Sequence, residues 1–253
     1  MNAETRTELP PPQSYDSLDD LIDSVLEDVD SASNPYLVAL EDGSLEFDDF
    51  VETQIQFYFV VTFFSRPMAT VAARIPEPEL RLEILRNVWE EHGEGDLEKA
   101  HGATFREFLE RLAGVSAETL QGRALWPEAR LFDTALAGAA ALDESIVGVG
   151  MLGMIERMFV DISGRLGRGV VARGWLSEDR MIHYDLHEVL DVKHSEDFFR
   201  VLRVRWDADP ESRYYIDQGL RLGAAAFDGL YRGLFRARTR RWRAAHRDHH
   251  ARS

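Results

Sequence analysis

Two histidines and an aspartate recur at helical spacing near residue 190. In HYDLHEVLDVKH (183–194), Asp191 and His194 follow His187 by four and seven residues. At about 100° per residue, these offsets place the three side chains within roughly 60° of one another on one helix face. Two imidazoles and a carboxylate suit Fe(II), Mn(II) or Zn(II). A solvated polar face would have the same spacing, so this motif alone leaves both interpretations open.

A second group of polar residues lies in WEEHGEGDLEKAH (89–101). It supplies His101 and four upstream acids, which are Glu90, Glu91, Glu94 and Glu98. Gly93 and Gly95 weaken a helix here, so helical angles do not decide which acid lies beside His101. A solvated helix start explains most of these acids equally well.

The third candidate is Glu156, the lone carboxylate of the apolar stretch VGVGMLGMIERMFV (147–160). A buried carboxylate needs a cation or a hydrogen-bonded partner. Arg157 is adjacent but points about 100° away on a helix. A metal ion is one candidate partner, and an arginine or histidine from another helix is the other.

Five of the eight histidines fall in these two clusters, at 92–101 and 183–194. Carboxylates and histidines that several helices direct into one core are typical of di-iron carboxylate proteins. The ferritin-type Glu-x-x-His motif occurs once, at Glu98 and His101, with no second copy. We therefore do not expect a ferritin-like bundle.

The surrounding sequence predicts helices almost throughout. Strand signals are nearly absent, and apolar residues follow the helical period in segment after segment. The predicted helices cover 17–32, a segment capped by Ser44 with a kink or break at Pro67, one from Pro78 toward the 89–101 motif, one ending near Gly114, 127–142, 143–172, one capped by Ser177 and one from Asp209. SNPY (33–36) is interpreted as a turn. The expected fold is all-α, with about seven or eight helices.

Composition bounds the class of protein. The chain has 253 residues, of which 45% are hydrophobic, and no uncharged apolar run reaches 18 residues. No membrane span or secretory signal is expected, and we predict a cytoplasmic protein. The absence of cysteine excludes disulfides, thiolate ligands and a cysteine nucleophile. The net charge of −16 argues against nucleic-acid binding.

Charge is unevenly spread along the chain. Residues 1–50 carry 14 Asp or Glu against one Arg, whereas residues 232–253 carry eight Arg against one Asp. We predict a disordered N-terminus at 1–14, one helical domain at 15–242 and a basic tail at 243–253. The tail is interpreted as a frayed, solvated end rather than a contact surface. The long last helix is compatible with a homodimer.

The two motifs in order resemble those of the haem-oxygenase-like di-iron oxidases and oxygenases, the iron-containing redox enzymes. Glu91-x-Gly-x-Gly-Asp-x4-His101 is similar to an early family motif, and His187-x3-Asp191-x2-His194 is similar to a late one. Glu156 lies between them, in the apolar central helix where the family places a bridging carboxylate. The resemblance extends over residues 30–240 and implies a haem-oxygenase-like helical bundle.

The resemblance also implies a function and a ligand set. The iron ligands would be Glu91, His101, Glu156, His187, Asp191 and His194, with Glu94 in reserve for Glu91. Two iron ions would activate O2, with an external electron donor, to oxidise a small-molecule metabolite by amine N-oxygenation, desaturation or oxidative carbon–carbon cleavage. Haem is not expected, because no histidine precedes His92. The alternatives are a cofactor-independent or thiamine- or quinone-metabolism enzyme on the same fold, or a non-enzymatic metal-binding protein.

Overall fold

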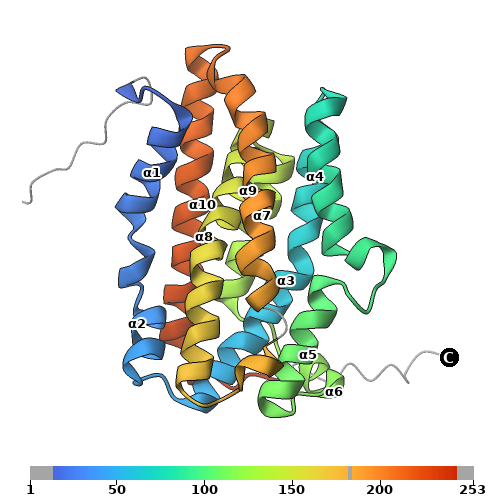
Figure 1. Ribbon diagram of the computed structural model, residues 1–253, viewed down its shortest axis with the longest axis vertical. Coiled ribbons are helices and arrows are strands. Elements are labelled where there is room, and N and C mark those ends of the chain that lie inside the picture. The colour runs from blue at the N-terminus through green and yellow to red at the C-terminus, as the bar shows by residue number, and fades with distance from the viewer. Residues whose placement is uncertain (1–13, 182–183, 244–253) are drawn as a thin grey trace, which may run out of the picture.

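The structure is a computed structural model that describes residues 14–181 and 184–243, with the backbone alone at 184–191. Within these residues the chain is a bundle of ten α-helices (Figure 1), so the all-α prediction is confirmed. The helices are α1 (Leu18–Val29), α2 (Pro35–Asp42), α3 (Phe47–Arg74), α4 (Pro78–Glu91), α5 (His101–Ala113), α6 (Ala117–Gln121), α7 (Pro127–Ala141), α8 (Ser145–Ala172), α9 (Tyr184–Trp206) and α10 (Pro210–Ala237).

The predicted count of seven or eight helices is wrong, because the prediction does not include two short helices, α2 and α6. SNPY is a helix start rather than a turn: the Asn34 side chain accepts a hydrogen bond from the Tyr36 amide, and Pro35 occupies the first turn. Ser116 caps the five-residue α6 in the same way through the amide of Thr119. Both segments are too short to show a clear helical period.

Four other predictions about helix ends and breaks have mixed outcomes. Ser17 caps α1 with Asp20 as the reciprocal partner, and Asp209 caps α10, as predicted. Ser44 does not cap α3, which begins after Glu46. Pro67 does not break α3, since the helix runs through it to Arg74. Pro67 is buried, and packing there offsets the cost of the missing backbone hydrogen bond.

The start of the helix that carries the opening motif also differs from the prediction. Ser177 precedes a single 3-10 turn, Glu178–Arg180, without a side-chain cap, and α9 begins at Tyr184. The predicted disordered N-terminus and basic tail, at 1–14 and 243–253, lie outside the described residues except for Ser14 and Arg243.

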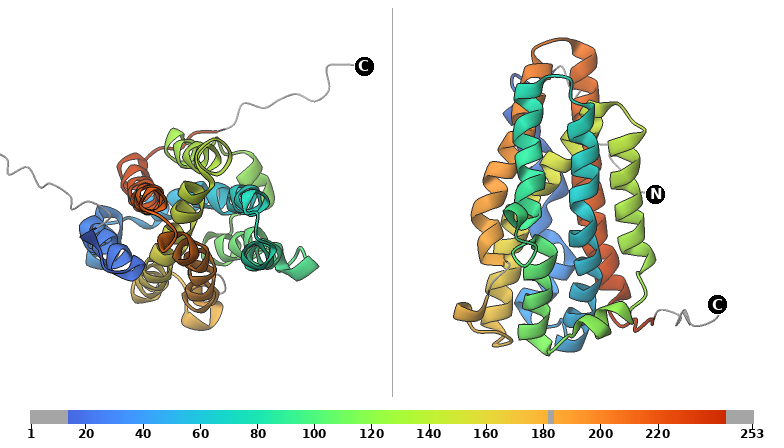
Figure 2. Two further views of the ribbon diagram at one scale, coloured as in Figure 1. Left: turned by 90° about the horizontal axis from the view of Figure 1, so that it is seen from above. Right: turned by 90° about the vertical axis from the view of Figure 1, so that its right-hand side faces the viewer.

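Helix α8 runs through the middle of the bundle, with α9 and α10 beside it (Figure 2). Most of its residues are buried, as its apolar sequence predicts. It crosses α10 closely because glycines lie at the crossing. A Cβ on Gly219 would fall 2.5 Å from the Val147 carbonyl oxygen, and one on Gly223 would fall 2.5 Å from that of Met151. The buried apolar side chains form one cluster around this helix.

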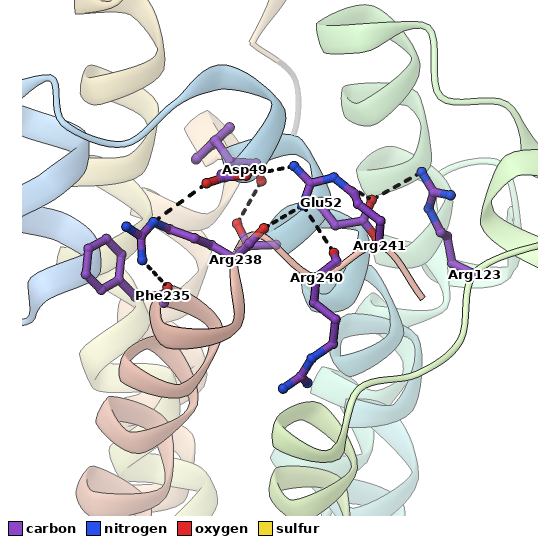
Figure 3. Close-up of polar contacts among 9 residues, drawn as sticks. Asp49, Glu52, Arg123, Phe235, Arg238, Arg240 and Arg241 are labelled. Atoms are coloured by element: carbon purple, nitrogen blue, oxygen red, sulfur yellow. Dashed lines mark hydrogen bonds and ion pairs between the residues drawn. The ribbon is translucent and has the colours of Figure 1, made fainter. Parts of the chain in front are cut away.

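At one end of the bundle, α3 and the residues that follow α10 share a group of ion pairs, which we call the arginine cluster: Asp49, Glu52, Arg123, Arg238 and Arg241 (Figure 3). Arg123 Nη2 lies 3.1 Å from Glu52 Oε2, and Arg241 Nη2 lies 2.7 Å from Asp49 Oδ1. The Ala124 amide also donates to the Trp242 carbonyl oxygen over 3.2 Å, and Arg243 forms an isolated β-bridge with Arg123, so the described chain beyond α10 is attached to the bundle.

None of the described helices is both long and apolar enough to cross a membrane.

Candidate metal centre

The chain reverses direction between α4 and α5 through a turn that depends on glycine. Gly93 and Gly95 have φ values of 64° and 93°, in the left-handed region. A Cβ on Gly93 would lie 2.6 Å from the backbone nitrogen of Ala100, so no larger residue fits there without movement. The turn returns the chain so that α5 begins at His101, beside the last residue of α4, Glu91.

Glu91 and His101 consequently meet in the interior. His101 Nδ1 lies 2.8 Å from Glu91 Oε1, and each residue is only 8% exposed. A helix end and a helix start, separated in sequence by the glycine turn, thus present one carboxylate and one imidazole to the same space. The spacing of the early motif reflects this geometry.

Glu156 and His194 join this pair from α8 and α9. Glu91, Glu156 and His194 each offer a donor atom, and these atoms all lie within 4.8 Å of one another. Glu156 is 4% exposed and His194 is fully buried. Donor atoms around a single ion, at bond lengths of about 2.0–2.2 Å, are separated by at most about 4.4 Å. The three side chains are therefore close to the separation that one metal ion requires.

Glu90 is a residue of this region that the sequence-based ligand set does not contain. His194 Nε2 lies 2.6 Å from Glu90 Oε2, and Lys193 Nζ lies 3.7 Å from Glu90 Oε1. Glu90 and Glu91, consecutive at the end of α4, thus contact histidines of different helices. The signal was present in the sequence, since Glu90 is one of the acids near the helical face considered for His101. Because α4 ends at Glu91, no continuous helix joins Glu90 to His101. Glu90 contacts His194 of α9 instead.

The other predicted or considered residues are placed as follows. Glu94, the reserve ligand, is exposed on the glycine turn with φ 55° and lies apart from the group. His92 is also exposed, and its Nδ1 donates to the Val88 carbonyl oxygen over 2.7 Å. The backbones of His187 and Asp191 belong to α9, but their side chains lie outside the described residues, as does all of His183.

A cavity of about 50 Å³ adjoins three of these residues. By the same measure a water molecule needs roughly 10–15 Å³, so the space suits a few small atoms. Its walls are Glu91, His101, Glu156 and the apolar residues Phe57, Val60, Val61, Phe64, Phe132, Ile155, Phe159 and Phe227. Four residues of the stretch FYFVVTFF (57–64) of α3 therefore line the site, while the other four are half-buried or exposed.

Comparison with known families assigns the chain to one of them. Residues 51–228 match the family described as iron-containing redox enzyme, which is well over half of the sequence. The chain belongs to this iron-containing redox enzyme family. The matched range includes both motifs and Glu156, and the predicted resemblance is confirmed. No curated protein matches the chain.

Solved structures share the fold at low sequence identity. A TenA homologue from Pyrococcus furiosus superposes with a TM-score of 0.62 at 16% identity, covering 85% of this chain and 98% of its own. A domain of unknown function with a haem-oxygenase-like fold, from Shewanella denitrificans OS217, has a TM-score of 0.60 at 16% identity, with coverage of 86% and 89%. A TenA homologue from P. horikoshii OT3 gives 0.60 at 14%, with coverage of 84% and 99%. The haem-oxygenase-like fold is thereby confirmed, and such identities carry nothing about activity.

Proposed function

We propose that this member of the iron-containing redox enzyme family is a non-haem di-iron enzyme that uses O2 to oxidise a small metabolite. The observation that carries the proposal is the buried group of Glu91, Glu156 and His194, whose donor atoms lie within 4.8 Å of one another. Exposed acids often gather without binding a metal, but these side chains come from three different helices and are buried. Burial of carboxylates is costly unless a cation or hydrogen-bond donors compensate.

The available donors suit iron. Carboxylate oxygens and imidazole nitrogens form the sets that non-haem iron sites use, and His101 adds a second described imidazole beside Glu91. In the proposed centre, Glu91, His101 and His194 would hold iron together with Glu156, which comes from the central helix. His187 and Asp191, which the sequence resemblance adds, would complete the ligand set. Iron, when bound, supplies the electrons that activate O2.

The protein groups around the ligands bind and shield. Glu90 contacts His194 over 2.6 Å, which fixes the orientation of that imidazole as carboxylates commonly do for histidine ligands. The phenylalanines of the cavity exclude water and lower the local dielectric constant, which protects a reactive oxidant from quenching. Beyond the ligands, the described cavity wall is apolar, so the part of the substrate that reacts there is an uncharged group.

This apolar wall limits the kind of group on which each of the three reactions expected from the sequence would act. Desaturation and oxidative carbon–carbon cleavage act on carbon groups, which pack well against phenylalanine side chains. Amine N-oxygenation requires an unprotonated amine at the same position, since the low-dielectric wall disfavours an ammonium ion. An external electron donor remains part of the proposal for any of the three.

The second candidate is a metal-independent enzyme on the same fold, which the solved TenA homologues share. In that case the paired carboxylates and histidines would serve as acids and bases. The chain has no cysteine, so this activity would have to proceed without a thiolate nucleophile.

Anaerobic reconstitution with Fe(II) separates the two candidates. We expect the purified protein to bind two iron ions and, on exposure to O2, to give a transient visible absorption band. Glu156→Ala should lose most of the bound iron and the transient band. Glu52→Gln is the matched control, because Glu52 is equally buried but belongs to the arginine cluster.

Two results would overturn the proposal. One is the failure of the protein to take up iron under these conditions. The other is iron uptake that is the same in the original protein, Glu156→Ala and Glu52→Gln, because iron would then bind elsewhere.

A further inference from the structure

One buried side chain near the proposed centre is left without hydrogen bonds. Asn87 of α4 has no exposed surface, and neither its amide nitrogen nor its amide oxygen has a hydrogen-bond partner within the described part of the chain. A buried polar group without a partner destabilises the folded protein. Native proteins retain such groups rarely, so each one needs an explanation.

The position of Asn87 points to the metal centre. The buried residues of α4 are Leu80, Ile84, Asn87 and Glu91, which form a single stripe along the helix. Asn87 precedes Glu91 by four residues, and side chains at this separation are neighbours on a helix surface, with Cβ atoms about 5–6 Å apart. Asn87 is therefore the polar neighbour of Glu91 on the face that α4 turns to the interior.

Metal binding would change what Glu91 requires. In the described structure Glu91 Oε1 lies 2.8 Å from His101 Nδ1, the distance of a hydrogen bond. A metal ion that binds both atoms takes the place of this hydrogen bond, so the carboxylate loses it. Carboxylate ligands are normally oriented by a further hydrogen-bond donor.

We propose that Asn87 is a positioning residue of the metal centre, whose amide N–H donates to the Glu91 carboxylate when Glu91 holds the metal. This inference rests on the proposed function, because it requires that Glu91 be a ligand. It explains why an amide is kept on the buried face of α4 at a cost to the metal-free protein.

The test replaces Asn87 by leucine, which has the same branched arrangement of heavy atoms and no polar atoms. Its matched control is Asn34→Leu. Asn34 is also buried, but its side chain accepts from the Tyr36 amide and donates to Asp228 Oδ1 over 2.7 Å. Thermal unfolding is measured for the three proteins without metal and with Fe(II) under anaerobic conditions, and Fe(II) affinity is measured by competition with a chelator.

We expect metal-free Asn87→Leu to be at least as stable as the original protein, while Asn34→Leu unfolds at a lower temperature. Fe(II) affinity should fall about tenfold or more in Asn87→Leu and stay unchanged in Asn34→Leu. The reduced affinity is the readout that a purely structural role for Asn87 would not give.

Three outcomes would overturn the inference. A metal-free Asn87→Leu that is destabilised as much as Asn34→Leu, or that fails to fold, would show that the amide is already bonded without metal. Equal Fe(II) affinity in Asn87→Leu and the original protein would show that the amide does not support a ligand, with the proposed function intact. Absence of Fe(II) binding in the original protein would remove the proposed function and this inference together.

Discussion

Two groups of buried carboxylates in the described part of the bundle differ in their partners. In the arginine cluster, Glu52 lies 3.1 Å from Arg123, with Arg241 at 4.0 Å. In the candidate metal centre, Glu91 and Glu156 lie among histidines. Arginine is always charged, whereas histidine near neutral pH is often neutral. The first cluster therefore has permanently charged partners for its carboxylates, while the partners described at the second are histidines, which can also bind a metal ion.

The pKa of Glu52 shows that burial affects a carboxylate strongly even inside the arginine cluster. Burial raises this pKa, and the opposing effects of Arg123 and Arg241 do not fully offset it. A buried carboxylate at the metal centre would face the same desolvation. The comparison thus predicts that removing a charge lowers the metal affinity of the candidate metal centre. In the arginine cluster, removing a charge should instead lower the free energy of unfolding.

The largest expected effect is that of Glu156→Gln on metal binding. The substitution removes the charge but keeps the shape, so we expect Fe(II) affinity to fall by at least a hundredfold. Equilibrium dialysis with Fe(II) measures the affinity, and chemical denaturation checks that the metal-free variant is folded. An affinity equal to that of the original protein would mean that Glu156 does not hold the metal.

The second prediction concerns Arg123→Leu. It leaves Glu52 buried without its nearest cation, and we expect the free energy of unfolding to fall by about 3 kcal/mol. The double variant Glu52→Gln/Arg123→Leu should recover most of this loss, and Fe(II) uptake should be unchanged in both. Denaturant titration provides the measurement. An equal loss in single and double variants would show that the arginine acts through packing and not through its charge.

Much of the fold follows from local sequence signals. Ser17 and Asp209 carry recognisable caps, and the apolar character of 145–172 predicts the central helix correctly. The misses are segments where a local signal conflicts with packing or is too short. Pro67 predicts a break that the surrounding core overrides, and α6 has only five residues. The domain boundaries at 15 and 242 stay a prediction.

The candidate site was predictable to the extent that motifs fix residue types and order. Glu91, His101, Glu156 and His194 are brought together as expected. The choice of Glu91 over Glu94 could not come from helical angles, because it depends on where α4 ends and on the left-handed turn that follows. Glu90 and Asn87 were missed because their importance depends on which neighbouring helix each one faces, and this is a property of the packed bundle.

A further carboxylate, Asp133, extends the comparison because no ion pair with an arginine or histidine is described for it. It is half-buried on α7, and its Oδ1 has no hydrogen-bond partner among the described residues. Burial raises its pKa to about 7, although Arg130 and Arg66 act to lower it. In the unfolded chain the pKa is about 3.9, so between these values the folded state binds the extra proton. Stability should therefore decline as pH rises from about 4 to about 7.

Asp133→Asn tests this sign. We expect the variant to be more stable than the original protein at pH 8, by about 1–2 kcal/mol after allowance for solvent screening, and to converge with it near pH 4. Denaturation at a series of pH values gives the difference. A stabilisation that is the same at pH 4 and pH 8 would exclude ionisation of Asp133 as its cause.

The smallest expected effect is that of Arg241→Ala, at the exposed edge of the arginine cluster. Arg241 pairs with Asp49 over 2.7 Å, but its side chain is 38% exposed. An exposed ion pair contributes about 0.2–1 kcal/mol, and salt screens it. We expect a loss of about 0.5 kcal/mol at low ionic strength that fades as salt is added, measured by denaturation with and without salt. The loss of unfolding free energy in Arg123→Leu should persist in salt, because Glu52 is then buried without its nearest cation. If both losses fade alike, the arginine cluster is a surface feature, and its contrast with the buried histidine site no longer holds.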